Sequence, residues 1–172
     1  NRKMIQRFDE CWIPDFEEKP NLSGNLSHGH FLLKNTLTRY IGSLSRIKKI
    51  EHKIQRKAII ILSGPEPQRT FLEKNILAQA LELPYQFLLV KGQTEQKEHF
   101  YFNENIEVVS FLTSEKLNQA IAASEIVISR SGYTTLMDLV FLEKKAILIP
   151  TPGQTEQEYL ADHFFEQKIN RP

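Results

Sequence analysis

The stretch from Ser129 to Asp138 combines residue types that could bind a nucleoside diphosphate. A short β-branched run precedes it and residues with helical spacing follow it, which predicts a helix beginning at the end of a strand. Small residues in a first helical turn leave backbone N–H groups free, and these groups and the helix dipole favour a diphosphate. Thr134 and Thr135 lie four and three residues before Asp138, so the three share a helical face.

Asp138 would lie one turn from this anion site. A carboxylate in that place can accept both hydroxyls of a ribose, as acidic residues do in dinucleotide-binding folds. A plainer interpretation makes Ser131 the N-cap of the helix and Asp138 a solvated helix residue. Spacing alone leaves both interpretations open.

Two other loops could contribute to the same site. Ser63-Gly64 follows a strand-like run, and Gly64 would let a ligand approach the backbone closely, although the loop matches neither a P-loop nor a G-x-G-x-x-G fingerprint and by itself is an ordinary turn. Gln154 and Gln157 offer neutral donors and acceptors that suit sugar hydroxyls. Glu158 has capping-box spacing from Thr155, which favours a structural role.

Strands and helices alternate regularly after residue 57. The predicted strands are 58–62, 87–90, 106–109, 126–128 and 146–149, with helices after the first, third, fourth and fifth, and a polar loop at 93–105. This order predicts an α/β fold with a doubly wound parallel sheet. Ligands bind at the carboxyl ends of the strands of such a sheet, which is where the three loops fall.

Composition limits the partners and the compartment. The net charge of +1 gives no field that would attract nucleic acid. The single cysteine, Cys11, cannot form an internal disulfide, and no apolar run approaches the length of a membrane span. These features indicate a cytoplasmic protein. The basic stretch 45–57 is interpreted as a solvated linker, with a surface that meets anionic lipid as the minority alternative.

The run from Ile128 to Ala161, ISRSGYTTLMDLVFLEKKAILIPTPGQTEQEYLA, closely resembles the donor-binding motif of family 28 glycosyltransferases. The similarity extends loosely over 57–165. It implies the GT-B architecture, in which two Rossmann-like domains face a cleft and the C-terminal domain binds the nucleotide-sugar. Residues 7–14 resemble the last strand of the N-terminal domain, and 39–46 resemble the crossover. We therefore expect a remnant of the N-terminal domain and crossover at 1–47 and a truncated C-terminal domain at 48–172.

The resemblance also implies roles for single residues. Ser131 and Gly132 would lie at the diphosphate, and Thr134 and Thr135 would line the phosphate and sugar pocket. Asp138 would bind the ribose diol, where the family usually has Glu. Gln157 would contact sugar hydroxyls, and Phe111 and Leu112 would border the base. The chain departs from the family in the first loop, which has one glycine, and at Gln157-Glu158, where the family has two glutamines. The expected donor-binding set is Ser63, Gly64, Phe111, Leu112, Ser131, Gly132, Thr134, Thr135, Asp138, Gln154 and Gln157.

The expected activity is transfer of a sugar, most simply N-acetylglucosamine, from a UDP-sugar to a lipid-linked or saccharide acceptor, without a metal or cofactor. The chain would be the donor-binding half, inactive alone, with its general base in a missing N-terminal domain. A peripheral position at the inner face of the membrane would follow. The pair His28 and His30 could bind metal or act as a base, but two ligands are too few for a metal site and we favour a plain loop. The alternatives are a UDP-sugar 2-epimerase and a non-catalytic donor-binding subunit of a split transferase.

Overall fold

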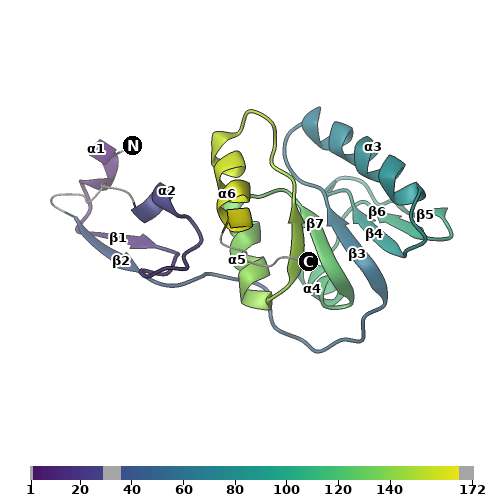
Figure 1. Cartoon of the computed structure of the whole chain (residues 1–172), viewed down its shortest axis with the longest axis horizontal. Helices are drawn as coiled ribbons and strands as arrows, with labels where there is room; N and C mark the ends of the chain where they lie inside the picture. The colour runs from purple at the N-terminus through teal and green to yellow at the C-terminus, as the bar shows by residue number, and fades with distance from the viewer. Residues whose placement is uncertain (1, 29–35, 167–172) are drawn as a thin grey trace.

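The computed structural model describes residues 2–28 and 36–166. The described chain forms an N-terminal segment with a two-stranded sheet, followed by a layered unit built on a six-stranded sheet (Figure 1). The N-terminal segment contains α1 (Arg2–Ile5), β1 (Glu10–Ile13), α2 (Asn25–His28) and β2 (Leu37–Tyr40). An irregular linker, 41–55, joins it to the larger sheet.

The larger unit alternates strands and helices as the sequence pattern predicts. Its elements are β3 (Arg56–Ile61), α3 (Gln68–Leu81), β4 (Phe87–Val90), β5 (His99–Asn103), β6 (Ile106–Val109), α4 (Ser114–Ala122), β7 (Ser124–Ser129), α5 (Tyr133–Leu142), β8 (Lys145–Leu148) and α6 (Thr155–Glu166). The second and third predicted strands, 87–90 and 106–109, have these bounds to the residue, and the other three are shifted by one or two residues.

The strand order of the larger sheet is β5-β6-β4-β3-β7-β8, and every neighbouring pair except β5–β6 is parallel. Among the parallel strands, chain order runs outward from β3 in one direction to β6, and then from β7 in the other direction to β8. This is a doubly wound sheet, and the order reverses between β3 and β7. The predicted fold class is confirmed, and the crevice expected to bind ligands lies at the carboxyl ends of β3 and β7.

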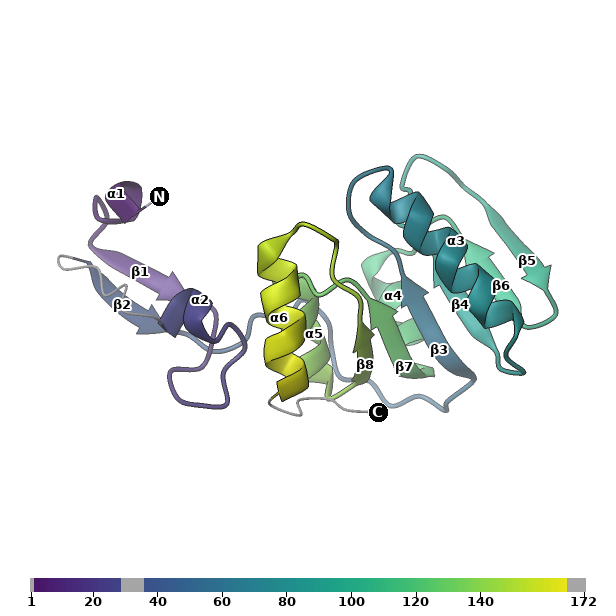
Figure 2. The same cartoon turned by 45° about the horizontal axis from the view of Figure 1, so that its top comes forward.

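The two faces of the sheet have separate cores because side chains of a strand alternate between faces. Ala58, Ile60 and Leu62 lie with α3 in one core, and Ile59 lies with α4, α5 and the linker residue Ile47 in the other. Figure 2 shows α3 in front of the sheet and α4 behind it. This packing of helices on both faces fixes the positions of the strand ends, and therefore of the loops that follow them.

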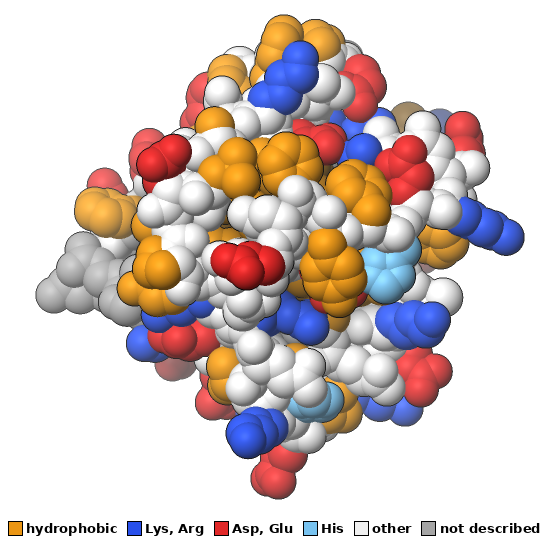
Figure 3. All heavy atoms as spheres, turned by 90° about the vertical axis from the view of Figure 1, so that its right-hand side faces the viewer, with side chains coloured by type: hydrophobic (Ala, Val, Ile, Leu, Met, Phe, Trp, Pro, Cys, Tyr) orange, Lys and Arg blue, Asp and Glu red, His pale blue; other side chains and the backbone are white. Residues whose placement is uncertain are grey.

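The predicted polar loop at 93–105 is wrong in part, because β5 forms inside it and pairs antiparallel with β6. Its side chains are mostly exposed, so the segment lacks the buried face by which a strand is recognised in sequence. Phe100, Tyr101 and Phe102 are at least 40% exposed. Figure 3 looks at this edge of the sheet, where hydrophobic side chains gather between charged ones.

The N-terminal segment is docked on α5 and α6 by the loop between β1 and α2. Leu22 from this loop is 2% exposed and joins a core with residues of both helices, including Leu136 and Leu160. The hydroxyl of Tyr133 donates to the Pro14 carbonyl oxygen at 2.9 Å. Residues 15–28 therefore pack on the larger unit, whereas the expected domain boundary at 47/48 stays a prediction. In the described ranges, no helix is long and apolar enough to cross a membrane.

Candidate functional site

The N-terminus of α5 is the place where the sequence predicts an anion site. β7 ends at Ser129, and α5 begins four residues later at Tyr133. Gly132 is the N-cap residue and makes no side-chain capping bond, and the first bond within the helix runs from the Leu136 N–H to the Gly132 carbonyl. In residues 2–28 and 36–166 the backbone N–H groups of 133–135 have no acceptor. Such donors and the helix dipole favour an anion, so the anion site stays a prediction with suitable donors in place.

The Ser131 side chain does not cap α5, and its expected place at the diphosphate stays a prediction. It is fully buried, and its hydroxyl donates to the Gln157 carbonyl oxygen at 2.7 Å. The N-cap interpretation of Ser131 is therefore wrong, because Gly132 holds that position. The Ser131 hydroxyl instead ties the start of α5 to the first turn of α6. Thr134 is exposed and Thr135 is half-buried, and within the described residues neither hydroxyl has a hydrogen-bond partner.

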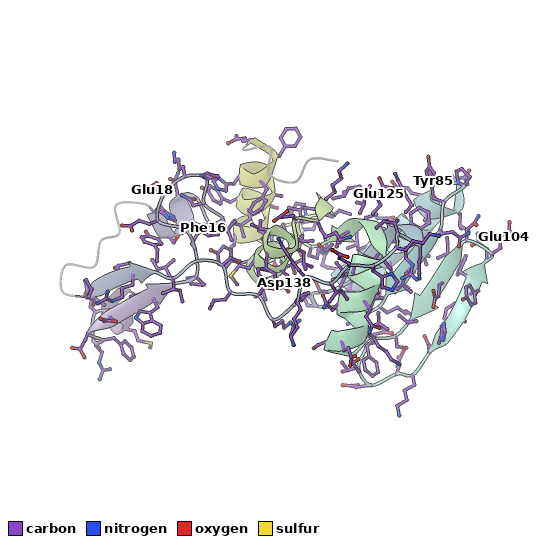
Figure 4. All side chains as sticks on the ribbon, turned by 90° about the horizontal axis from the view of Figure 1, so that it is seen from below. Phe16, Glu18, Tyr85, Glu104, Glu125 and Asp138 are labelled. Atoms are coloured by element: carbon purple, nitrogen blue, oxygen red, sulfur yellow. The ribbon has the colours of Figure 1, made fainter. Side chains whose placement is uncertain are left out.

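Asp138 is buried, at 9% exposed, so its interpretation as a solvated helix residue is wrong. The linker covers it: the Ser45 hydroxyl donates to Asp138 Oδ1 at 2.7 Å, and the Ser43 hydroxyl donates to the Met137 carbonyl at 3.2 Å. Figure 4 shows Asp138 between the N-terminal segment and the sheet. Asp138 Oδ2 has no hydrogen-bond partner in the described chain. One carboxylate oxygen therefore holds the linker, and the other is available to a ligand.

The loop between β8 and α6 is held by its own glutamine and glutamate side chains. Gln157 Oε1 accepts from the Thr151 N–H at 2.9 Å, and Gln157 Nε2 donates to Gln154 Oε1 at 2.6 Å. Glu158 Oε1 accepts from the Gly153 N–H at 2.9 Å, so the glutamate has the predicted structural role. The predicted Thr155–Glu158 capping box does not form, because the glutamate reaches two residues before Thr155. A sugar would have to displace or share the amide contacts of Gln157.

The remaining predicted residues follow β3 and β6. Ser63 and Gly64 are exposed, and Gly64 has φ +99° with nothing within 4 Å of a Cβ built on it. Glycine is thus required there by the backbone conformation, and space for a ligand is open. Phe111 and Leu112 are half-buried and precede Thr113, the N-cap of α4. Because these loops follow parallel strands of one sheet, they lie at the same carboxyl edge as the start of α5.

Arg130 is a residue of this edge to which sequence reasoning assigned no role. It is 4% exposed, and its guanidinium donates to the carbonyls of Ile149, Pro150 and Gln68 at 2.8–3.3 Å. It therefore connects the loops that follow β3, β7 and β8. Burial lowers the pKa of Arg130, and in the described part of the chain no carboxylate pairs with it. No pattern in the sequence indicates this role, because a single arginine between two serines resembles a surface residue.

Three buried polar atoms at this edge have no hydrogen-bond partner in the described residues: Ser129 Oγ, Arg130 Nε and Thr151 Oγ1. Ser129 ends β7 and Thr151 follows β8, and these two strands are neighbours. The Ile149 N–H, just after β8, donates to the Ser129 carbonyl. Buried polar groups are normally satisfied, so such a cluster marks a place that a ligand or water completes. The cluster coincides with the crevice expected from the strand order.

The histidine pair is only partly described. His28 Nδ1 lies 3.8 Å from Asp15 Oδ2, and its ring stacks on Tyr40 at 4.6 Å, whereas His30 lies outside the described residues. Asp15 is fully buried, and although burial alone would raise the pKa of its carboxyl, hydrogen bonds from Ser23 and from backbone N–H groups hold it below the usual value. In the described ranges, no three His, Cys, Asp or Glu residues are grouped to hold a metal ion.

Comparisons with known proteins agree with this geometry. The family model for the glycosyltransferase family 28 C-terminal domain matches residues 48–170. Two curated relatives share the name UDP-N-acetylglucosamine--N-acetylmuramyl-(pentapeptide) pyrophosphoryl-undecaprenol N-acetylglucosamine transferase. The relative from Caldicellulosiruptor saccharolyticus is 27% identical over 92% of this chain and 46% of its own length. The relative from Natranaerobius thermophilus is 25% identical over 98% of this chain and 47% of its own length.

The chain thus spans about half the length of these relatives. Among solved structures, the glycotransferase of kitacinnamycin aligns with 87% of this chain and 40% of its own chain, with a TM-score of 0.56 and 14% identity. That similarity shows the fold alone. The family match covers the whole larger sheet, the start of α5 and the loop before α6. The chain therefore belongs to glycosyltransferase family 28 and contains the C-terminal domain of that family.

Proposed function

We propose that this chain is the donor-binding half of a UDP-sugar-dependent hexosyltransferase that transfers N-acetylglucosamine to a lipid-linked or saccharide acceptor. The observation that carries the proposal is the start of α5. Its backbone N–H groups lack acceptors in the described chain, and they lie at the switch point of a family 28 domain. The names of the two longer relatives supply the sugar and the lipid-linked class of acceptor.

The proposed binding mode assigns one part of the donor to each loop. The diphosphate lies at the N–H groups of α5, near the buried guanidinium of Arg130. The ribose diol donates to Asp138 Oδ2, the base lies near Phe111 and Leu112, and the sugar lies near Gln157. As the bond to the sugar breaks, negative charge grows on the leaving diphosphate, and preoriented N–H donors stabilise it.

The acceptor and the general base belong, in this proposal, to the N-terminal domain that the longer relatives have. Transfer needs the acceptor hydroxyl held close to the anomeric carbon and deprotonated there. The carboxylates beside the donor site already have partners: Glu158 holds the Gly153 N–H, and Asp138 holds Ser45. The β1–β2 pair would be the part of that domain present here. A cytoplasmic protein, peripheral at the inner membrane face, would meet such an acceptor.

Titration calorimetry with UDP, GDP and NAD tests the donor. We expect UDP to bind and to be displaced by UDP-N-acetylglucosamine, with weaker or no binding of GDP and NAD. Binding of NAD without binding of UDP would reject the proposal.

A transfer assay tests whether this chain can transfer the sugar without the N-terminal domain. Radiolabelled UDP-N-acetylglucosamine is incubated with lipid-linked and saccharide acceptors, and this chain is compared with a full-length family member. We expect no turnover by this chain. Turnover at a rate near that of the full-length enzyme would show that the chain is a complete enzyme, and acceptor-free conversion of the sugar would indicate an epimerase.

A further inference from the structure

The loop between β1 and α2 lies against α6 at a distance that glycine alone allows. Gly24 has φ +49°, and a Cβ built on it would collide with the Tyr159 hydroxyl oxygen and lie 2.8 Å from His163 Cε1. Any other residue would have to move the loop away from these two rings. Tyr159 and His163 are one turn apart on α6, and their rings stack with centroids 5.8 Å apart. Figure 2 shows α2, which follows Gly24, on the side of the N-terminal segment that faces α6.

Hydrogen bonds fasten the same loop to the same two rings. The Asn25 N–H donates to the Tyr159 hydroxyl at 2.7 Å, and His163 Nε2 donates to the Asn21 carbonyl at 3.0 Å. Between these two bonds, Leu22 is buried in the core that it shares with α5 and α6. The contact therefore combines close backbone packing, directed hydrogen bonds and one apolar anchor.

The loop is also attached to the two-stranded sheet. Asp15, two residues after β1, is fully buried, and its carboxylate accepts from the N–H groups of Leu22 and Ser23 at 2.7 and 2.9 Å. The Tyr40 hydroxyl at the end of β2 donates to the Ser27 carbonyl at 3.1 Å. The loop is therefore bound to the β1–β2 sheet on one side and to α6 on the other.

This attachment is held by less apolar burial than the larger sheet. Leu22 is the one buried apolar side chain of residues 14–28, all of which the structure describes. The larger sheet, by contrast, has an apolar core on each face. Segments with few buried apolar contacts open at a lower free energy than the core of a domain does. Residues 14–28 should therefore open before the larger sheet unfolds.

We propose that residues 14–28 act as a latch, which fastens the β1–β2 sheet to α5 and α6 when it is closed and releases it while the larger sheet stays folded. The latch lies outside residues 48–170, which the family model matches. All of its contacts are made within this chain, so the proposal does not depend on the donor or on its binding mode.

The latch determines the width of a hollow beside the start of α5. This hollow has a volume of about 610 Å³. Ile13, Pro14 and Leu26 line one wall, and Tyr133 and Thr155, the first residues of α5 and α6, line the other. Because the two walls belong to the two parts that the latch joins, release of the latch widens the hollow. A ligand that touches both walls would favour the closed latch.

Hydrogen exchange of the 172-residue chain, followed by NMR residue by residue, tests the latch without any ligand. The reporters are the amides of Leu22, Ser23 and Asn25, and the amides of 58–61 in β3 serve as the reference. In the unchanged chain we expect the latch amides to exchange at least about a hundredfold more slowly than in an unstructured peptide, but faster than those of β3. Latch amides that exchange as fast as in an unstructured peptide would overturn the proposal.

Two variants should release the latch to different extents. Gly24→Ala places a Cβ against the rings of α6 and should speed exchange of the latch amides at least about tenfold, while the β3 amides stay within about threefold. Tyr159→Phe keeps the ring and removes only the acceptor of the Asn25 N–H, so exchange at Asn25 should rise about twofold to tenfold. Equal acceleration of latch and β3 amides would show that the loop does not open by itself, and no change in Tyr159→Phe would show that this contact does not close it; either result overturns the proposal.

The matched control for the glycine variant is Gly153→Ala. Gly153 also has a positive φ, +81°, but nothing lies within 4 Å of a Cβ built on it. This variant therefore adds backbone strain without a collision, and the latch amides should stay within about threefold of the unchanged chain. Acceleration of the latch amides equal to that in Gly24→Ala would reduce the effect to backbone strain and would also overturn the proposal.

Discussion

Replacing Asp138 with alanine tests whether one carboxylate serves both the linker and the ligand. Asp138 Oδ1 accepts from the Ser45 hydroxyl at 2.7 Å, and Oδ2 faces no donor in the described chain. If the ribose diol uses Oδ2, the variant loses a hydrogen bond to a charged group, which is worth about 1.5–3 kcal/mol. UDP binding should then weaken about tenfold to hundredfold.

The same variant should also lower the free energy of unfolding, because it removes the partner of Ser45. Ser45→Ala separates the two effects, since it removes the linker bond and keeps the carboxylate. We expect Ser45→Ala to lower the free energy of unfolding by about 1 kcal/mol and to leave UDP affinity within about twofold. The double variant should cost about 1 kcal/mol less than the sum of the single variants, because each one removes the same bond.

Calorimetry with UDP and urea unfolding measure the two quantities on all four proteins. Unchanged UDP affinity in Asp138→Ala would refute the ribose role and leave Asp138 as an anchor of the linker. Strictly additive stability losses would refute the Ser45–Asp138 hydrogen bond. A tenfold loss of UDP affinity in Ser45→Ala would show that the linker, and not the carboxylate, sets the affinity.

Three further outcomes follow from buried groups. Arg130→Met should weaken UDP binding about tenfold and lower the free energy of unfolding by about 1–3 kcal/mol, because the carbonyls of Ile149, Pro150 and Gln68 lose their donor; a loss of stability with intact UDP binding would make Arg130 purely structural. The folded-state pKa of Asp15 lies below its usual value of 3.8, so its stabilisation is complete above that value and is lost as the pH falls through the folded-state pKa. Unfolding free energy should therefore decline below about pH 4, and an equal decline in Asp15→Asn would contradict this assignment. Tyr133→Phe removes the bond to the Pro14 carbonyl and should cost about 0.5–1.5 kcal/mol in urea unfolding, whereas no cost would mean that this contact does not hold the N-terminal segment.

The parallel strands β4 and β6 could be predicted from sequence because nearly all of their residues are buried, on both faces of the sheet. The runs at 87–90 and 106–109 are nearly continuous apolar residues between polar loops, and the structure has strands with the same bounds. β5 could not be recognised in the same way, because an exposed edge strand has no buried face to mark its period. The positions of the site loops followed from the strand order, since all of them come after parallel strands.

The contacts within the site depended on residues far apart in the sequence. Asp138 lies under the linker because Ser45, 93 residues earlier, bonds to it, and no local pattern contains that pairing. Ser131 likewise bonds to Gln157, 26 residues later, instead of capping its own helix. Local spacing offered the capping interpretation, and long-range packing excluded it. Which of these residues touch a donor stays a prediction.

The position of β3 at the centre of the sheet determines when the crevice can form during synthesis. β3 is the first strand of the larger sheet to be made, yet one of its two neighbours is β7, and Lys57 pairs with Glu125 across a separation of 68 residues. Contacts between residues so far apart form slowly because the intervening chain must first be ordered. A nascent chain that ends before residue 129 lacks a complete β7. The crevice then has only the side formed by β3, and one edge of β3 is unpaired. In the proposed binding mode, a donor would stabilise this domain only after β7 and the start of α5 have left the ribosome.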